Sequence, residues 1–125
     1  MMTEKIEKLI QQVSKANNRL VDALKQPENE LQRDAVVQRF EFTFELSWKL
    51  IAEVLKYKGF EVYGPRDSLR SGAENAIIID AEVWMSLLEA RNLTVHTYDE
   101  ETSREVYEKS KQLPRLVEAL IEKLR

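Results

Sequence analysis

The spacing of apolar residues constrains the fold of this 125-residue sequence more than any other feature. Over most of the chain, apolar residues recur at intervals of three and four, which places each set on one face of a helix. No segment alternates convincingly with a period of two, as a half-buried strand would. The only strand-like run, Ala76–Asp80, is too short and isolated to form a sheet. The sequence therefore predicts an all-α fold.

Two long helices are predicted in the first half of the chain. The first runs from about Thr3 to Lys25, and the segment QPENE then ends it, because proline lacks the amide donor that a helix interior needs. Its apolar face consists of Ile6, Leu9, Ile10, Val13, Ala16, Leu20 and Leu24. The second runs from about Asn29 to Lys58, and Gly59 is expected to end it in the left-handed conformation. Its apolar stripe consists of Val36, Phe40, Phe44, Trp48, Ile51 and Leu55.

A short helix over Arg66–Ala73 and two longer helices are predicted in the second half. The longer ones begin near Asp80 and Asp99, and both aspartates are expected to accept a backbone N–H as helix caps. Pro114 predicts a kink or a break of the last helix near Gln112. The apolar residues of these two helices are Val83, Trp84, Leu87 and Leu88, and Val106, Leu113, Leu116, Leu120 and Leu124. Together the helices predict an antiparallel up-and-down four-helix bundle with a short extra helix, in one domain of residues 1–125.

Composition narrows the classes of function. The chain has 19 Lys and Arg against 22 Asp and Glu, a net charge of −3, whereas DNA-binding domains are usually basic, so no DNA partner is expected. It has no cysteine and one histidine, and no glycine-rich phosphate loop, so we expect neither a metal site nor a cofactor. No apolar run approaches the ~20 residues that span a bilayer, and the polar N-terminus lacks the pattern of a secretory signal. We therefore expect a cytoplasmic protein without membrane contact.

Two sets of side chains on the second helix lie away from its apolar stripe. Glu41, Glu45 and Lys49 follow one another at steps of four, and we interpret them as a solvated row with one ion pair, worth a few tenths of a kcal/mol. Phe42 and Leu46 are apolar but also lie off the stripe. A lone pair of helices would leave them in water, so they predict a second contact surface, with another subunit.

The segment RNLTVHTY, residues 91–98, holds the only histidine and the best candidates for chemistry. Arg91 offers a permanently charged fork that matches phosphate oxygens, and His96 can pass a proton near neutral pH. RNA can be cut without a metal when a base activates the 2′-OH and a cation stabilises the charge on phosphorus. On a straight helix a five-residue step turns about 140°, so Arg91 and His96 would not share a face. Either the backbone bends between them, or a second copy of the chain completes the site.

The spacing of Arg91, His96 and Tyr98 resembles the R-x4-H-x-Y motif of the HEPN superfamily. More narrowly, the chain is similar to the nucleotidyltransferase substrate-binding proteins, also described as HEPN toxins paired with minimal nucleotidyltransferase antitoxins. The segments RFEFTFELSWKLIAEVLKYKG, YGPRDSLRSG and WMSLLEARNLTVHTYDE all read like that family, in the same order. The resemblance covers most of the chain, and the last segment is the specific one.

This resemblance implies a helical bundle that forms a homodimer with its motifs at the interface, and a small nucleotidyltransferase as partner. It implies that Arg91 and His96 cleave RNA, and that the partner silences the protein by transferring AMP from ATP to Tyr98. Asn92 and Asp99, which adjoin the motif residues, are further candidates for supporting the site.

Two other interpretations stay open at this point. In the first, the chain is a non-catalytic subunit that binds the substrate or nucleotide of a two-component nucleotidyltransferase. In the second, it is a helical dimerisation module with no chemistry. Growth arrest on expressing the chain alone, relieved by its neighbour, would separate the toxin from both alternatives.

Overall fold

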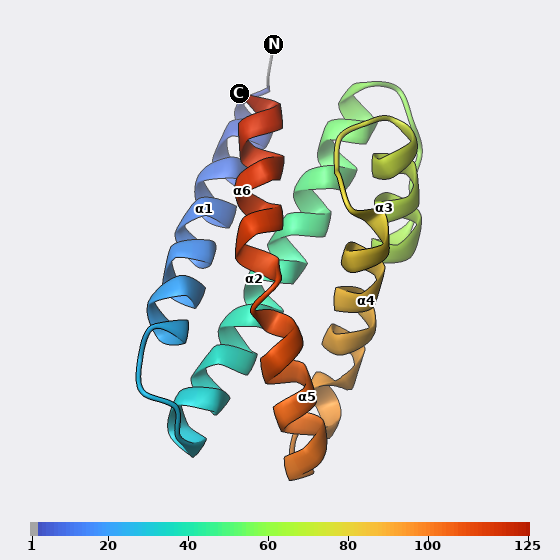
Figure 1. Cartoon of the computed structure of the whole chain (residues 1–125). Coiled ribbons are helices and arrows are strands. Elements are labelled where there is room, and N and C mark those ends of the chain that lie inside the picture. The colour runs from blue at the N-terminus through green and yellow to red at the C-terminus, as the bar shows by residue number, and fades with distance from the viewer. Residues whose placement is uncertain (1–2) are drawn as a thin grey trace.

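All regular secondary structure in the part that the structure describes is helical, with no strand. The computed structural model covers residues 3–125, and its helices appear in Figure 1. They are α1 (Glu4–Leu24), α2 (Glu30–Tyr57), α3 (Gly64–Glu74), α4 (Ala81–Asn92), the 3₁₀ turn η1 (Leu93–His96), α5 (Glu100–Ser110) and α6 (Leu113–Leu124). The predicted all-α class is therefore confirmed. Across these residues, none of the helices has the length and apolar character to cross a bilayer.

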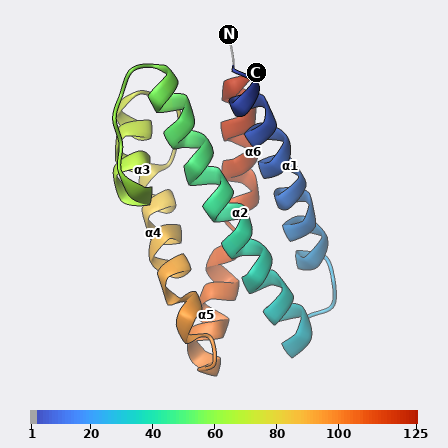
Figure 2. The same ribbon diagram turned by 180° about the vertical axis from the view of Figure 1, so that it is seen from behind.

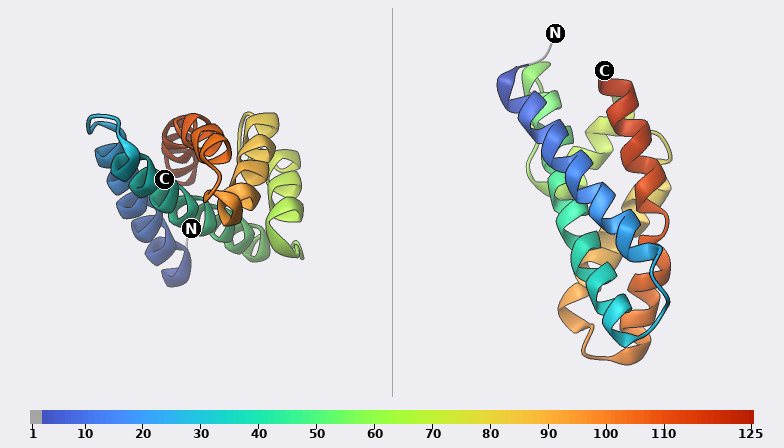
Figure 3. Two further views of the ribbon diagram at one scale, coloured as in Figure 1. Left: turned by 90° about the horizontal axis from the view of Figure 1, so that it is seen from below. Right: turned by 90° about the vertical axis from the view of Figure 1, so that its left-hand side faces the viewer.

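The long helix α2 organises the packing. It runs antiparallel to α1 and also contacts α3, α4 and α5, while α6 packs against α1. Figure 2 shows α2 crossing the molecule between α4 and α1. In the view from below, α1 lies on one side of α2, and α3 and α4 lie on the other (Figure 3). Helices α5 and α6 follow one another along the same side of the molecule, where the sequence predicts a single last helix.

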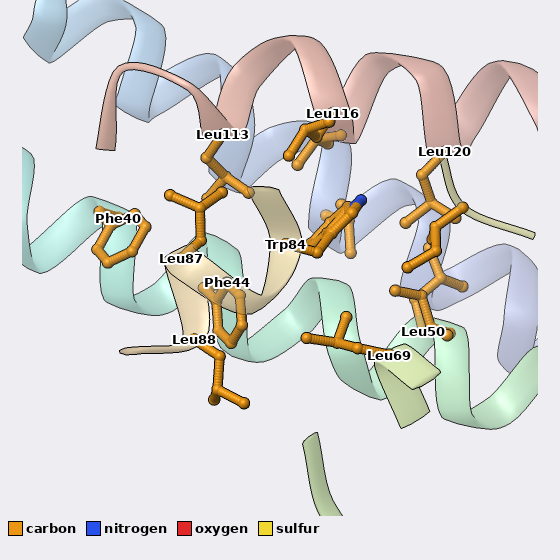
Figure 4. Packing of buried hydrophobic residues seen from close by; sticks show 14 of the residues in the cluster. Phe40, Phe44, Leu50, Leu69, Trp84, Leu87, Leu88, Leu113, Leu116 and Leu120 are labelled. Atoms are coloured by element: carbon orange, nitrogen blue, oxygen red, sulfur yellow. The ribbon is translucent and has the colours of Figure 1, made fainter. Parts of the chain in front are cut away.

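The core is built from the predicted apolar faces. Phe40 and Phe44 of α2 are fully buried, and the Phe44 ring lies 6.2 Å from that of Trp84 on α4, tilted by 49°. Leucines of α6 close this cluster from above in Figure 4. Tilted aromatic pairs add roughly 0.5–1.5 kcal/mol beyond the area that they bury. Some predicted residues depart from the prediction, because they are only half-buried: Leu9, Ile10, Ala16, Leu24, Trp48, Val83 and Leu124.

Side-chain caps explain three of the six α-helix starts in residues 3–125. Thr3 accepts the Ile6 N–H at 3.1 Å, and Asn29 starts α2 in the same way. The predicted cap Asp99 is confirmed at the start of α5. Asp80 does precede α4, but its predicted side-chain cap is wrong. Its backbone is left-handed, at φ 54°, and its carboxylate binds Arg115 of α6 at 2.8 Å instead of an amide of its own helix.

Glycine and proline set the remaining boundaries. Gly59 has a φ of 97° and ends α2 as predicted, and the Phe60 N–H donates to the Leu55 carbonyl at 2.9 Å. The predicted break in the last helix is confirmed, because α5 ends at Ser110 and α6 begins at Leu113. Pro114 stands in the first turn of α6, where its missing amide hydrogen costs no hydrogen bond.

Candidate functional site

The backbone bends inside the motif, as the five-residue step between its charged groups requires. Helix α4 ends at Asn92, the 3₁₀ turn η1 carries the chain through His96, and α5 begins at Glu100. A 3₁₀ turn winds more tightly than an α-helix, so side chains after Asn92 leave the faces that α4 defines. The motif therefore lies at the end of the molecule where α4 passes into α5, at the bottom of Figure 1.

Arg91 is held against α2. Its guanidinium forms an ion pair with Glu45 and donates to the Asn92 side-chain oxygen at 3.0 Å. The side chains of Arg91 and Glu45 are 24% and 29% exposed, so water still reaches the pair. The predicted supporting residue Asn92 thus contacts Arg91 directly, and the guanidinium keeps one edge toward solvent.

The interpretation of the α2 glutamates as a solvated row is wrong. Glu45 pairs with Arg91 and not with Lys49, and Glu41 accepts the Thr94 hydroxyl at 3.2 Å. Both carboxylates therefore face the motif. Helical spacing shows which side chains share a face but not which later segment covers that face, and α4 returns to α2 about fifty residues downstream. The sequence signal for this contact is two carboxylates one helical turn apart, because an arginine elsewhere in the chain could neutralise them.

An open groove of about 470 Å³ surrounds Arg91. It is lined by Glu41, Phe42, Glu45, Arg91, Asn92, Thr94 and Val95. Phe42, predicted as a dimer contact, is 51% exposed and lies in this groove. The other predicted contact, Leu46, packs partly against the core of its own chain, and its contact with another subunit stays a prediction.

His96 and Tyr98 form a second, exposed part of the motif. The imidazole Nδ1 lies 3.4 Å from the Tyr98 oxygen, and the two rings meet edge to face with centroids 5.9 Å apart. Tyr98 is 85% exposed. Within residues 3–125 no hydrogen bond joins this pair to Arg91, so one chain holds the motif in two separate parts.

Asp99 fixes the backbone directly after Tyr98. Its carboxylate accepts the Thr102 backbone N–H at 3.0 Å and the Thr102 hydroxyl at 2.8 Å. These two hydrogen bonds hold the pKa of the Asp99 carboxyl below its ordinary value, with the backbone N–H as the larger cause. Asp99 therefore supports the site through the start of α5, and its backbone N–H also donates to the His96 carbonyl at 3.1 Å.

The arrangement suits phosphate chemistry at an exposed site. Arg91 presents a fixed cation at the edge of an open groove, and fork-shaped guanidinium groups bind phosphate oxygens in pairs. His96 stands in water one turn later, where an imidazole can exchange protons. Glu45 shares the guanidinium, so any anion that binds Arg91 competes with a carboxylate.

Two solved structures resemble this chain. A protein from Thermus thermophilus is 32% identical, with a TM-score of 0.84, over 90% of this chain and 98% of its own. The Haemophilus influenzae protein HI0074 is 26% identical, with a TM-score of 0.73, over 96% of both chains. Its structure is described as revealing the fold of a substrate binding domain of a nucleotidyltransferase.

The curated relative and the family model agree with these structures. A Haemophilus influenzae (strain ATCC 51907 / DSM 11121 / KW20 / Rd) protein described as a probable ribonuclease HepT is 36% identical over 76 residues, which are 57% of this chain. The match spans about half, 52%, of that relative's length. A family model described as "Nucleotidyltransferase substrate binding protein like" matches residues 4–125. The family resemblance is thus confirmed, and the chain belongs to the nucleotidyltransferase substrate-binding protein family.

Proposed function

We propose that the chain is a HEPN-type toxin, a metal-independent endoribonuclease that acts as a homodimer and is silenced by a cognate nucleotidyltransferase. The observation that carries this proposal is the fixed Arg91 in an open groove, followed one turn later by the exposed pair of His96 and Tyr98. The similarity to a probable ribonuclease HepT supports it. In this proposal, helices α1–α6 of residues 3–125 form a four-helix bundle in which α5 and α6 make one column and α3 is the extra helix.

RNA cleavage needs only proton transfer and charge stabilisation in this mechanism. His96 removes the proton of a ribose 2′-OH, and the resulting oxygen attacks the adjacent phosphorus. The bond from phosphorus to the 5′-oxygen breaks, which leaves a 2′,3′-cyclic phosphate and a 5′-hydroxyl. Arg91 stabilises the negative charge that builds on the phosphate oxygens.

A dimer supplies the second proton-transfer group. Each chain has one histidine, and the departing 5′-oxygen needs a proton at the same time as the 2′-OH loses one. A two-fold axis near the groove brings in a second His96, so that one imidazole acts as base and the other as acid. The exposed Phe42 beside Arg91 supports an interface at this place.

Tyr98 is the control point in this proposal. Its oxygen attacks the α-phosphorus of ATP on the partner enzyme, the bond to the β-phosphate oxygen breaks, and pyrophosphate leaves while the phenolic proton passes to solvent. The attached AMP then places a phosphate next to His96, where it blocks RNA. Tyr98→Phe removes the acceptor oxygen, so intact mass should show no added AMP after incubation with the partner and ATP. Finding the adduct on Tyr107 instead, or no adduct on the unaltered chain with an active partner, would overturn this assignment.

Expression in cells tests the toxin proposal against its alternative. The chain alone should arrest growth, and co-expression of the neighbouring nucleotidyltransferase should relieve the arrest. The alternative is a non-catalytic substrate or nucleotide-binding subunit of a two-component nucleotidyltransferase, which the description of the HI0074 structure favours. Binding of nucleotide or of the partner without growth arrest would support that alternative and contradict the toxin proposal.

A further inference from the structure

A small polar pocket of about 190 Å³ lies beside Tyr98, apart from the groove that holds Arg91. Its walls come from the first turns of α2 and α5 and from the residues between η1 and α5. They are Glu30, Arg33, Asp34, Thr97, Tyr98, Glu100 and Ser103. Sequence spacing could not assemble this set, because α2 and α5 begin about seventy residues apart.

Ser103 is the buried polar group of this pocket. The residue is only 7% exposed, and its backbone N–H donates to the Asp99 carbonyl at 2.9 Å. Its side chain lines the pocket, where a bound group can reach the hydroxyl. Hydroxyl groups of largely buried residues are nearly always hydrogen-bonded, so this one favours a polar occupant of the pocket over an apolar one.

The charges on the walls define which occupant fits. Three carboxylates, of Glu30, Asp34 and Glu100, outnumber the single guanidinium of Arg33 on the walls. Arg33 is paired with Glu28 at 3.2 Å, and Glu100 is paired with Arg104 at 2.9 Å. A phosphate is therefore disfavoured inside the pocket. A divalent cation is disfavoured too, because the described residues bring no three acidic or histidine side chains close enough to hold one. A cationic side chain of a partner would meet Arg33, whose side chain is only 14% exposed and cannot easily move away.

A neutral group with several hydrogen-bond donors is compatible with all the residues that line the pocket. The two adjacent hydroxyls of a ribose donate well to carboxylates, as they do at the acidic residue of many dinucleotide sites. A hydroxyl of the sugar can also pair with Ser103. The pocket is smaller than the roughly 300–1,000 Å³ of typical ligand sites, so it admits one sugar ring and not a whole nucleotide.

We propose that this pocket binds the ribose of the nucleotide that Tyr98 carries, an inference that rests on the proposed function of Tyr98. Tyr98 is itself part of the wall, and its oxygen lies 3.4 Å from Nδ1 of His96, a residue that does not line the pocket. A phosphate on that oxygen therefore stays next to the imidazole while the sugar turns into the pocket. The bound sugar holds the nucleotide over His96, so the nucleotide blocks the site sterically and stays in place.

Titration of the unmodified chain with AMP tests the pocket without any partner or catalysis. Amide NMR signals of Thr97 and Ser103 should shift, and 2′,3′-dideoxy-AMP should bind about tenfold more weakly, since a hydrogen bond to a charged group is worth about that factor. Asp34→Asn and Glu100→Gln should each weaken AMP binding. Glu101→Gln is the matched control, because Glu101 is the exposed neighbour of Glu100 but does not line the pocket. Equal binding of AMP and dideoxy-AMP, or shifts confined to the groove of Arg91, would overturn the proposal.

A second titration asks whether the ribose comes from the nucleotide on Tyr98 or from RNA. After the partner has attached AMP to Tyr98, free AMP should no longer shift the Thr97 and Ser103 signals, because the attached sugar fills the pocket. If the modified chain still binds free AMP with unchanged affinity, the pocket serves another ribonucleotide, such as RNA, and the assignment to Tyr98 is wrong. Failure of an active partner to modify the chain contradicts the proposed function, whereas failure of the free AMP titration contradicts the pocket alone.

Discussion

The two parts of the motif differ in how firmly the fold holds them. Arg91 ends a packed helix, is mostly buried, and is tied to α2 through Glu45. His96 and Tyr98 lie on and after a 3₁₀ turn, are exposed, and contact each other through their side chains. The difference teaches that the scaffold fixes the cation in advance but leaves the groups that exchange protons or accept a modification open to other molecules.

RNA cleavage should be sensitive to the shape of the Arg91 side chain even when its charge is kept. Arg91→Lys keeps the charge but loses the planar fork that binds Glu45 and phosphate together. We expect the rate of RNA cleavage to fall by about 10²-fold, the effect of removing one preorganised donor to a developing charge. Circular dichroism should show an unchanged helix content. A lysine variant with nearly full activity would mean that Arg91 acts only as a diffuse charge.

The exposed part should depend on a second copy of the chain. Phe42→Glu places a charge in the groove at a position that is 51% exposed, so the monomer should fold normally. Light scattering should then report monomers, and cleavage should fall strongly because one chain holds a single histidine. Leu46→Glu is a poorer test, since Leu46 packs partly against its own core and the change would also destabilise the monomer. A dimer of the Phe42 variant with unaltered mass would place the interface elsewhere.

The ion pair between Glu45 of α2 and Arg91 of α4 should affect RNA binding and turnover in opposite directions. Glu45→Gln keeps the shape of the side chain but removes the charge that competes with phosphate for Arg91. We expect KM for RNA to fall, which means tighter binding, and kcat to fall as well, each by about two- to fivefold, the size of a partly exposed ion pair. Glu89→Gln, on the exposed face of α4, is the matched control. Parallel loss of kcat and of thermal stability without a change in KM would indicate a purely structural role for Glu45.

The smallest effect is expected from a change to Asp99, the cap of α5 that orients Tyr98. Because hydrogen bonds lower the pKa of Asp99 in the folded chain, its contribution to stability is complete above the ordinary Asp pKa of 3.8. That contribution is lost as the pH falls through the lowered value. Asp99→Asn keeps a capping oxygen but cannot titrate. The unfolding temperatures of the two proteins should therefore be close at neutral pH. Below about pH 4, only the unaltered chain should lose the stability that the Asp99 carboxylate contributes. Identical pH profiles of the two unfolding temperatures would contradict this account of the cap.

Local patterns predicted the fold well, but they could not predict the contacts of the site. The apolar spacing, Gly59, Asp99 and Pro114 act within a few residues of themselves, so sequence alone located most helices and their ends. The pairing of Arg91 with Glu45 joins residues 46 positions apart and exists only after α4 packs on α2. The same holds for the pocket beside Tyr98, whose walls come from the starts of two distant helices.

Asp80 shows the complementary limit. Its position before α4 was predictable from residue type, but its left-handed backbone and its partner Arg115 depend on where α6 lies. The residue that precedes a helix can therefore be located from sequence, but the partner of its side chain cannot.

RNA cleavage by the purified chain in excess EDTA tests the central claim most directly. The account predicts that cleavage persists without divalent cations and leaves a 2′,3′-cyclic phosphate. His96→Ala should lower the rate by about 10²–10⁴-fold, the usual contribution of a general acid–base group, while the helix content stays the same. Cleavage that stops in EDTA, or that continues at the full rate in the His96→Ala variant, would contradict the assignment of Arg91 and His96 as the catalytic residues.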